Sequence, residues 1–266
     1  MINFHINHKT LLQTFNVFLA MLFSLSTHAQ YAMFLQQGNI TFEKKVNTVA
    51  LMKERIGNDD DGWGSQILDA YKKSGVNFKT TYFNLSFNDG KTLYAPDKNI
   101  TASVAPSDFT DVANDNIVYS DLTAGQSVSL KNIFGDKFLI KDSARKINWK
   151  ITDEIRDIAG FHCRRANAII MDSIYVVAFY SPEILTSGGP ESFNGLPGMI
   201  LGVALPHDHV TWFATKVSVN PPVAESDITP PNKGKEYSNK EYFDKIKASM
   251  HDWGKSGSMI LQNAMY

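Results

Sequence analysis

Few residues in this sequence have the type and spacing that catalysis requires, and the first candidate is a thiol. Cys163 is the only cysteine in the chain. Its neighbours include His162, Arg164 and Arg165, and cationic neighbours lower the pKa of a thiol that they face. On a strand, however, adjacent side chains point to opposite faces. We therefore expect a buried, unreactive Cys163, with a reactive thiol as the alternative.

A second candidate is the run His207-Asp208-His209, which places two imidazoles at alternate positions. On a strand, both would project from one face and could bind a metal ion. No third ligand can be named from the sequence, and Pro206 suits a solvated turn. We expect the turn and no cofactor, and keep metal binding by His207 and His209 as the alternative.

The most distinctive stretch is rich in glycine and proline and covers residues 188–201. Pro197-Gly198 suits the centre of a type II turn, because glycine accepts a positive φ at the second central position. The apolar residues 199–203 then predict a buried strand. The stretch lacks the helix context and the lysine of a phosphate-binding loop. It therefore predicts a rigid structural turn, defined by Gly189, Pro190, Gly195, Leu196, Pro197 and Gly198.

This stretch resembles the motif of the GLPGLI family, a family of exported proteins from Bacteroidota that is named after it. The likeness covers most of residues 116–203, through the segments 138–142, 149–154, 158–166 and 178–184. Met199 and Phe179 depart from the usual leucine and tryptophan, and both remain apolar. The resemblance implies export and a β-rich fold, similar to the half-open barrels of lipoprotein carriers. It implies no established activity, substrate or catalytic residue.

The first 29 residues predict a cleavable signal peptide. Lys9 is their only charged residue, and an apolar run at 11–25 is followed by small residues that end in Ala29. About 15 apolar residues are too few to span a membrane comfortably. We expect cleavage after Ala29 and a periplasmic or secreted protein, with an uncleaved anchor as the alternative. No later stretch has the length of a transmembrane segment.

Composition and charge limit the partners of the chain. Of the 266 residues, 43% are hydrophobic, and 26 Lys and Arg stand against 27 Asp and Glu. This composition is typical of a globular protein. The near balance of charge provides no basic field for nucleic acid, which requires a surplus of cations to displace counterions.

The remaining pattern predicts strands with few helices. Short β-type runs alternate with turns from residue 77 to 184, including a hairpin signature around Asn88-Asp89-Gly90. Helices are predicted at 62–74 and at 238–253, and the second opens with a capping box, Ser238 to Glu241. We predict a mainly β fold over a single domain, 30–266: a single curved antiparallel sheet or half-open barrel with one or two short helices.

These observations favour a non-enzymatic, exported envelope protein. Alternating strands supply two faces, and two short helices cover little of either face. The concave face would then bind an apolar or amphipathic small molecule, or an envelope partner protein. The alternatives are an assembly or structural factor for an outer-membrane complex and a hydrolase with a non-standard site. In a further alternative, the loops at 95–115 and 221–235 fill the concave face and leave a packed core.

Overall fold

Alternation of apolar and polar residues is typical of the strands, which make up just under half of the described structure. The computed structural model describes residues 34–56, 63–75, 77–100 and 114–266, and Phe34–Tyr266 forms one compact unit. The strands are β1 (Gln37–Asn47), β2 (Phe78–Asn88), β3 (Lys91–Pro96), β4 (Ile117–Asp121), β5 (Gln126–Ile133), β6 (Asp136–Ser143), β7 (Lys150–Ile158), β8 (Phe161–Ile170), β9 (Ile174–Ser181), β10 (Met199–Leu205), β11 (Val210–Ser218) and β12 (Lys235–Tyr237). The predicted signal peptide, 1–29, lies outside the described residues.

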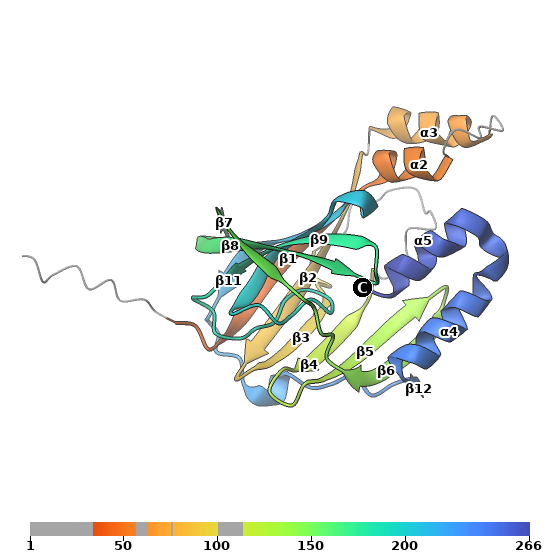
Figure 1. Cartoon of the computed structure of the whole chain (residues 1–266). Helices are drawn as coiled ribbons and strands as arrows, with labels where there is room; N and C mark the ends of the chain where they lie inside the picture. The colour runs from red at the N-terminus through yellow and green to blue at the C-terminus, as the bar shows by residue number, and fades with distance from the viewer. Residues whose placement is uncertain (1–33, 57–62, 76, 101–113) are drawn as a thin grey trace, which may run out of the picture. The chain divides into compact units, whose positions relative to one another are not determined.

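All these strands belong to one twelve-stranded sheet. Its order is β12-β6-β5-β4-β3-β2-β1-β11-β10-β9-β8-β7, and every pair is antiparallel except β12 with β6. The sheet bends so that β7, β8 and β9 lie over the interior faces of the strands that precede them (Figure 1). The predicted class, a mainly β protein with a curved antiparallel sheet, is confirmed.

Local sequence signals account for the turns that were predicted. In the β2–β3 hairpin, Asp89 and Gly90 both have positive φ, 46° and 76°. This is the backbone of a type I′ turn, which matches the twist of antiparallel strands. At the start of α4 (Asn239–Ser249), the Ser238 hydroxyl accepts from the Glu241 amide at 3.2 Å, and Glu241 accepts from the Ser238 amide at 2.7 Å. The capping box is therefore present.

The helices are more numerous than the one or two that we predicted. They are α2 (Thr48–Ile56), α3 (Trp63–Ser74), α4 (Asn239–Ser249) and α5 (Gly254–Ala264). The helix predicted at 238–253 ends where α5 begins, at Gly254. A Cβ on Gly257 would lie 2.4 Å from the carbonyl oxygen of Met250, so close packing of the two helices requires glycine. No helix in the described ranges is long and apolar enough to cross a membrane.

Two apolar clusters hold the unit together. The larger one lies between the two halves of the sheet and includes Phe83 and Tyr94, whose rings stack at 4.7 Å. The smaller one seals α4 and α5 against β5 and β6, through Phe138, Tyr242 and Ile260. The side of the sheet near β5 and β6 is therefore covered by the C-terminal helices (Figure 1).

The concave face is largely filled, and two segments of the described chain that were not predicted to do so contribute to this. Residues 101–113 of the expected 95–115 loop lie outside the described part of the chain. Within that part, the loop between β9 and β10 places Phe193 at 6.0 Å from Trp212, measured between ring centroids. Tyr266, which follows α5, lies 6.1 Å from the same Trp212 ring. A motif loop and the C-terminal residues thus pack against the floor of the sheet.

Candidate functional site

The predicted structural turn is a tightly bonded loop between β9 and β10. Gly198 has φ +140°, positive as expected. In a type II turn centred on Pro197-Gly198, the Met199 amide would donate to the Leu196 carbonyl. Here the Gly198 amide donates to that carbonyl instead, at 2.8 Å. The next amide, that of Met199, donates to Ile184 instead, at 3.1 Å. An added Cβ on Gly198 would lie 2.1 Å from the backbone oxygen of Ser181. Glycine is therefore required by close backbone approach as well as by φ.

The same loop places a carboxylate in the interior of the protein. Glu191 is only 3% exposed and has φ +51°, a conformation that residues other than glycine adopt rarely. Its Oε2 atom accepts a hydrogen bond from the Nδ2 atom of Asn116 at 2.9 Å, and both residues are buried. Its Oε1 atom has no hydrogen-bond partner in the described structure. Sequence reasoning missed Glu191, although a charged residue within a glycine-rich apolar stretch was a signal for it.

Three cationic side chains interact electrostatically with this carboxylate. Burial lowers the pKa of Lys44 and that of Arg145, and the negative charge of Glu191 opposes both changes. Burial likewise lowers the pKa of Lys131, to about 7; Glu191 again opposes the change, while the charges of Arg145 and Lys44 add to it. The interior is therefore a cluster in which one buried acid balances several buried bases.

The C-terminal residues contact two of these bases. The Nζ atom of Lys131 donates to the carbonyl oxygen of Ala264 at 2.9 Å and to the backbone oxygen of Tyr266 at 2.7 Å. Arg145 donates to the carbonyl of Met265, and the Tyr242 hydroxyl donates to that of Ala264 at 3.1 Å. The last carbonyls of a helix have no partner within it, so these side chains cap the end of α5.

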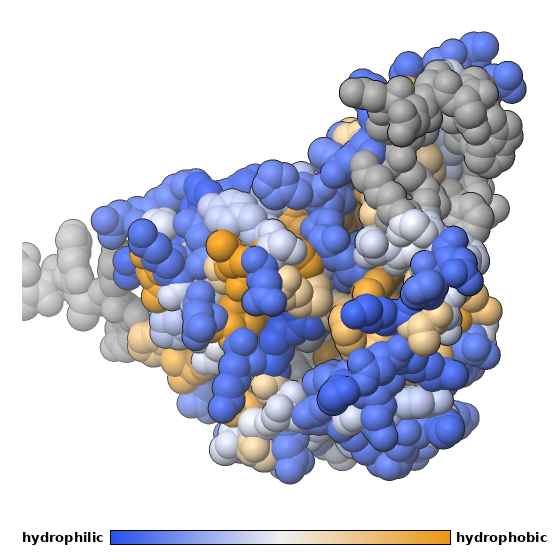
Figure 2. Space-filling model, turned by 45° about the vertical axis from the view of Figure 1, so that its right-hand side comes forward, coloured by the Kyte–Doolittle hydropathy of each residue, from blue (hydrophilic) through white to orange (hydrophobic). Residues whose placement is uncertain are grey.

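A cleft of about 550 Å³ opens onto this cluster. It lies between β5, β6 and α4. Its polar and cationic lining includes Ser129, Lys131, Arg145 and Ser192, and its apolar lining includes Tyr242, Phe243 and Met265. Figure 2 shows apolar atoms surrounded by hydrophilic ones on the side of the molecule that bears the helices. The cleft is thus both cationic and partly apolar.

Among the described residues that line the cleft, the one Asp or Glu side chain is already used by the backbone. Asp142 accepts from the amide of Asn239 at 2.9 Å and from that of Ser143 at 2.7 Å. These two hydrogen bonds lower its pKa, the one from Asn239 more strongly. Asp142 therefore anchors the start of α4 to β6. The Nη1 atom of Arg145 is buried and has no hydrogen-bond partner among the described residues.

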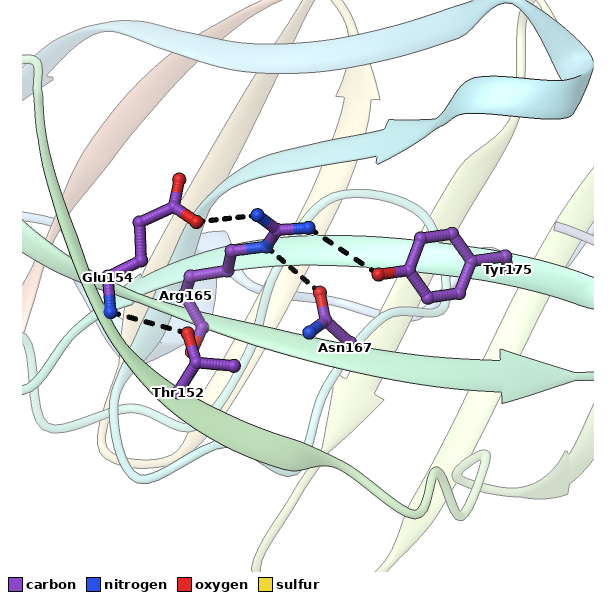
Figure 3. Close-up of polar contacts among 5 residues, drawn as sticks. All are labelled: Thr152, Glu154, Arg165, Asn167 and Tyr175. Atoms are coloured by element: carbon purple, nitrogen blue, oxygen red, sulfur yellow. Dashed lines mark hydrogen bonds and ion pairs between the residues drawn. The ribbon is translucent and has the colours of Figure 1, made fainter.

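The structure places Cys163 away from the cleft, on β8, with none of its surface exposed. Burial raises the pKa of its thiol to about 12. Arg165 donates to Glu154 at 2.5 Å, to Asn167 at 3.0 Å and to Tyr175 at 3.4 Å, as Figure 3 shows. The neighbouring cation is therefore held by its own partners, and the buried, unreactive thiol is the interpretation that the geometry supports.

His207 and His209 do not share the face of a strand, which was the premise of the metal hypothesis. Residues 206–208 form a 3₁₀ turn, and His209 has φ +53°. The Nε2 atom of His209 lies 3.3 Å from a carboxylate oxygen of Glu54 on α2. Asp208 accepts from the Nε2 atom of Gln262 on α5 at 2.7 Å. The described residues contain no group of three or more His, Cys, Asp or Glu side chains placed to hold a metal ion.

The fold and site together define a β-rich protein with one curved sheet and a motif loop that carries charge into its interior. A family model described as "Protein of unknown function (Porph_ging)" matches residues 169–202, from the end of β8 into β10. This is the GLPGLI family, so the resemblance predicted from the sequence is confirmed over that stretch, which contains the motif loop.

Comparison with curated proteins gave no match. Among solved structures, two crystal forms of PNGF-II have similar folds. The first has a TM-score of 0.51 at 15% identity and covers 81% of this chain and 34% of that one. The second has a TM-score of 0.50 at 14% identity and covers 86% and 33%. The chain therefore spans about a third of their length, and the likeness concerns the β-rich fold alone.

Proposed function

We propose that this protein is an exported envelope protein that binds an amphipathic anion in the cleft between β5, β6 and α4. One observation carries the proposal: the cleft combines buried cations at its base with apolar side chains on its wall. Lys131 is 4% exposed, and the apolar wall includes Tyr242 and Met265. The volume, about 550 Å³, falls within the range of small-molecule sites, roughly 300–1,000 Å³.

The charges support an anionic head group. A buried N–H group without a partner costs free energy, and more so when it belongs to a charged side chain. The Nη1 atom of Arg145 is such a group, and Asp142 is engaged by backbone amides. A carboxylate or phosphate placed beside Arg145 would accept from this atom in a charge-assisted hydrogen bond. The chain of the ligand would then lie along Phe243 and Met265.

Binding can be tested with dodecanoate and with dodecanol, which has the same chain and no charge. We expect dodecanoate to bind at least about tenfold more tightly in titration calorimetry, because one charge-assisted hydrogen bond corresponds to more than about 1.4 kcal/mol. Arg145→Met should remove this preference. Lys216→Met, which removes an exposed cation on β11, is the matched control and should keep it.

Equal affinity for the acid and the alcohol would contradict an anion site. If neither compound binds, nor changes the melting temperature, the small-molecule proposal is wrong. The partner-protein alternative then applies, and strand β7, an edge strand of the sheet with Ile155 65% exposed, is the first surface to examine. Edge strands offer free backbone groups to a partner.

Export is the second part of the proposal and rests on residues 1–29. The apolar run and Ala29 predict that the mature protein begins at Gln30, in the periplasm or outside the cell. Protein recovered from the envelope of its own cells should have the intact mass of residues 30–266. A recovered envelope protein that retains residues 1–29 would show that the segment is an anchor.

A further inference from the structure

The amine of Lys131 lies at the cleft, where a nucleophile that attacks a bound ligand would lie. It lines the cleft although its residue is only 4% exposed. Its two hydrogen bonds, to Ala264 and Tyr266, are the only ones that the described residues give it. The Nζ atom also lies 5.8 Å from the centroid of the Tyr242 ring. These contacts hold the amine at the wall of the cleft, where a ligand would lie.

The surroundings favour the neutral form. Burial lowers the pKa of Lys131 to about 7; Glu191 opposes this effect, while Arg145 and Lys44 add to it. A lysine that is desolvated and close to another cation is the usual form of a lysine that attacks carbonyl compounds. Lys240, at the mouth of the same cleft, is instead paired with Asp244 at 2.6 Å, and this hydrogen bond raises its pKa.

We propose that Lys131 forms a reversible imine with an anionic aldehyde or ketone that binds in the cleft with its negative group beside Arg145. This inference rests on the proposed function and names the class of ligand. The nitrogen lone pair attacks the carbonyl carbon and forms the C–N bond. Both amine hydrogens leave with the carbonyl oxygen as water, and the C=N bond remains. The reaction needs no oxidant or reductant.

Imine formation changes the end of α5. An imine nitrogen carries no hydrogen and cannot donate a hydrogen bond. The backbone oxygens of Ala264 and Tyr266 therefore lose Lys131 as a donor. The Tyr242 hydroxyl still donates to Ala264, and Arg145 still donates to Met265. The covalent step therefore loosens the C-terminal residues without releasing them all.

The test uses pyridoxal phosphate, an anionic aldehyde, followed by reduction with borohydride and peptide mapping. We expect Lys131 to be labelled at least tenfold faster than Lys240 or Lys146, and the rate to rise as the pH passes through about 7. Pyridoxal, which lacks the phosphate, should label Lys131 at least tenfold more slowly. Lys240→Met, the matched control at the mouth of the cleft, should leave labelling of Lys131 unchanged.

Lys131→Met should abolish the specific label, and protection of wild-type Lys131 by dodecanoate gives a second readout if this variant does not fold. Labelling of Lys131 no faster than of Lys240 would overturn the imine inference. If dodecanoate still binds in that case, the cleft remains an anion site and only the covalent step is wrong. If dodecanoate does not bind and Lys131 is not labelled, both proposals fail.

Discussion

Replacing Gly198 with alanine should lower the free energy of unfolding by more than about 3 kcal/mol, because backbone strain and a steric clash act together. The residue has φ +140°, and the new Cβ would lie 2.1 Å from the Ser181 oxygen and 2.7 Å from its carbonyl carbon. Both atoms belong to the backbone at the end of β9, which cannot move aside as a flexible side chain would. Urea unfolding of the purified variant measures the loss.

Gly195→Ala is the matched control within the same loop. Its φ is +91°, but the nearest atom to the added Cβ is Nε1 of Trp149, at 3.9 Å. This variant should lose only the conformational term, roughly 1–2 kcal/mol. Equal losses at the two positions would mean that Gly198 is required for φ alone and that β9 can shift.

Glu191→Gln should destabilise the fold by about 3 kcal/mol near neutral pH, as expected when a buried ion network loses one partner. The amide keeps the shape of the side chain and removes the negative charge that opposes the lowered pKa of Lys44, Lys131 and Arg145. Those cations then lose the negative charge of this buried acid.

The loss should also depend on pH. Lys131 has a pKa of about 7 in the folded protein and of about 10.4 in an unfolded chain. The unfolded state binds more protons between these values, so the free energy of unfolding rises with pH there. At about pH 9 Lys131 is already neutral, and removal of Glu191 should cost less than at about pH 6.

Denaturant unfolding at both pH values tests this, with Glu154→Gln as the control. Glu154 pairs with Arg165 on the surface, and its side chain is 52% exposed, so its loss should be below about 1 kcal/mol at either pH. A Glu191→Gln variant with the same loss at pH 6 and pH 9 would show that Lys131 and Glu191 are not coupled.

The sequence predicted the features that depend on neighbouring residues. Asp89-Gly90 determines its turn because only a few residue types accept positive φ twice in succession. Ser238 and Glu241 cap α4 across a single helical turn. Both signals lie within four residues of the chain, and neither needs the rest of the fold.

Features that depend on distant residues could not be read in the same way. Lys131 and Tyr266 meet only because α5 folds back onto β5, and the helix predicted at 238–253 ends before α5 begins. Glu191 reaches Asn116 through a loop conformation that its residue type does not favour. The cleft likewise could not be predicted, because no pattern in β5 or α4 alone indicates that the two elements face each other.

The position of β1 in the sheet has a consequence for the order of events during synthesis. Residue Phe42 of β1 lies opposite Phe83 of β2 on one side and Ala214 of β11 on the other. Among the described strands, the first to leave the ribosome thus pairs with the last but one. Contacts so distant in sequence form late and slowly, and a nascent chain without β11 keeps one edge of β1 unpaired. Under the export that we propose, this delay would keep the chain unfolded while it is still inside the cell.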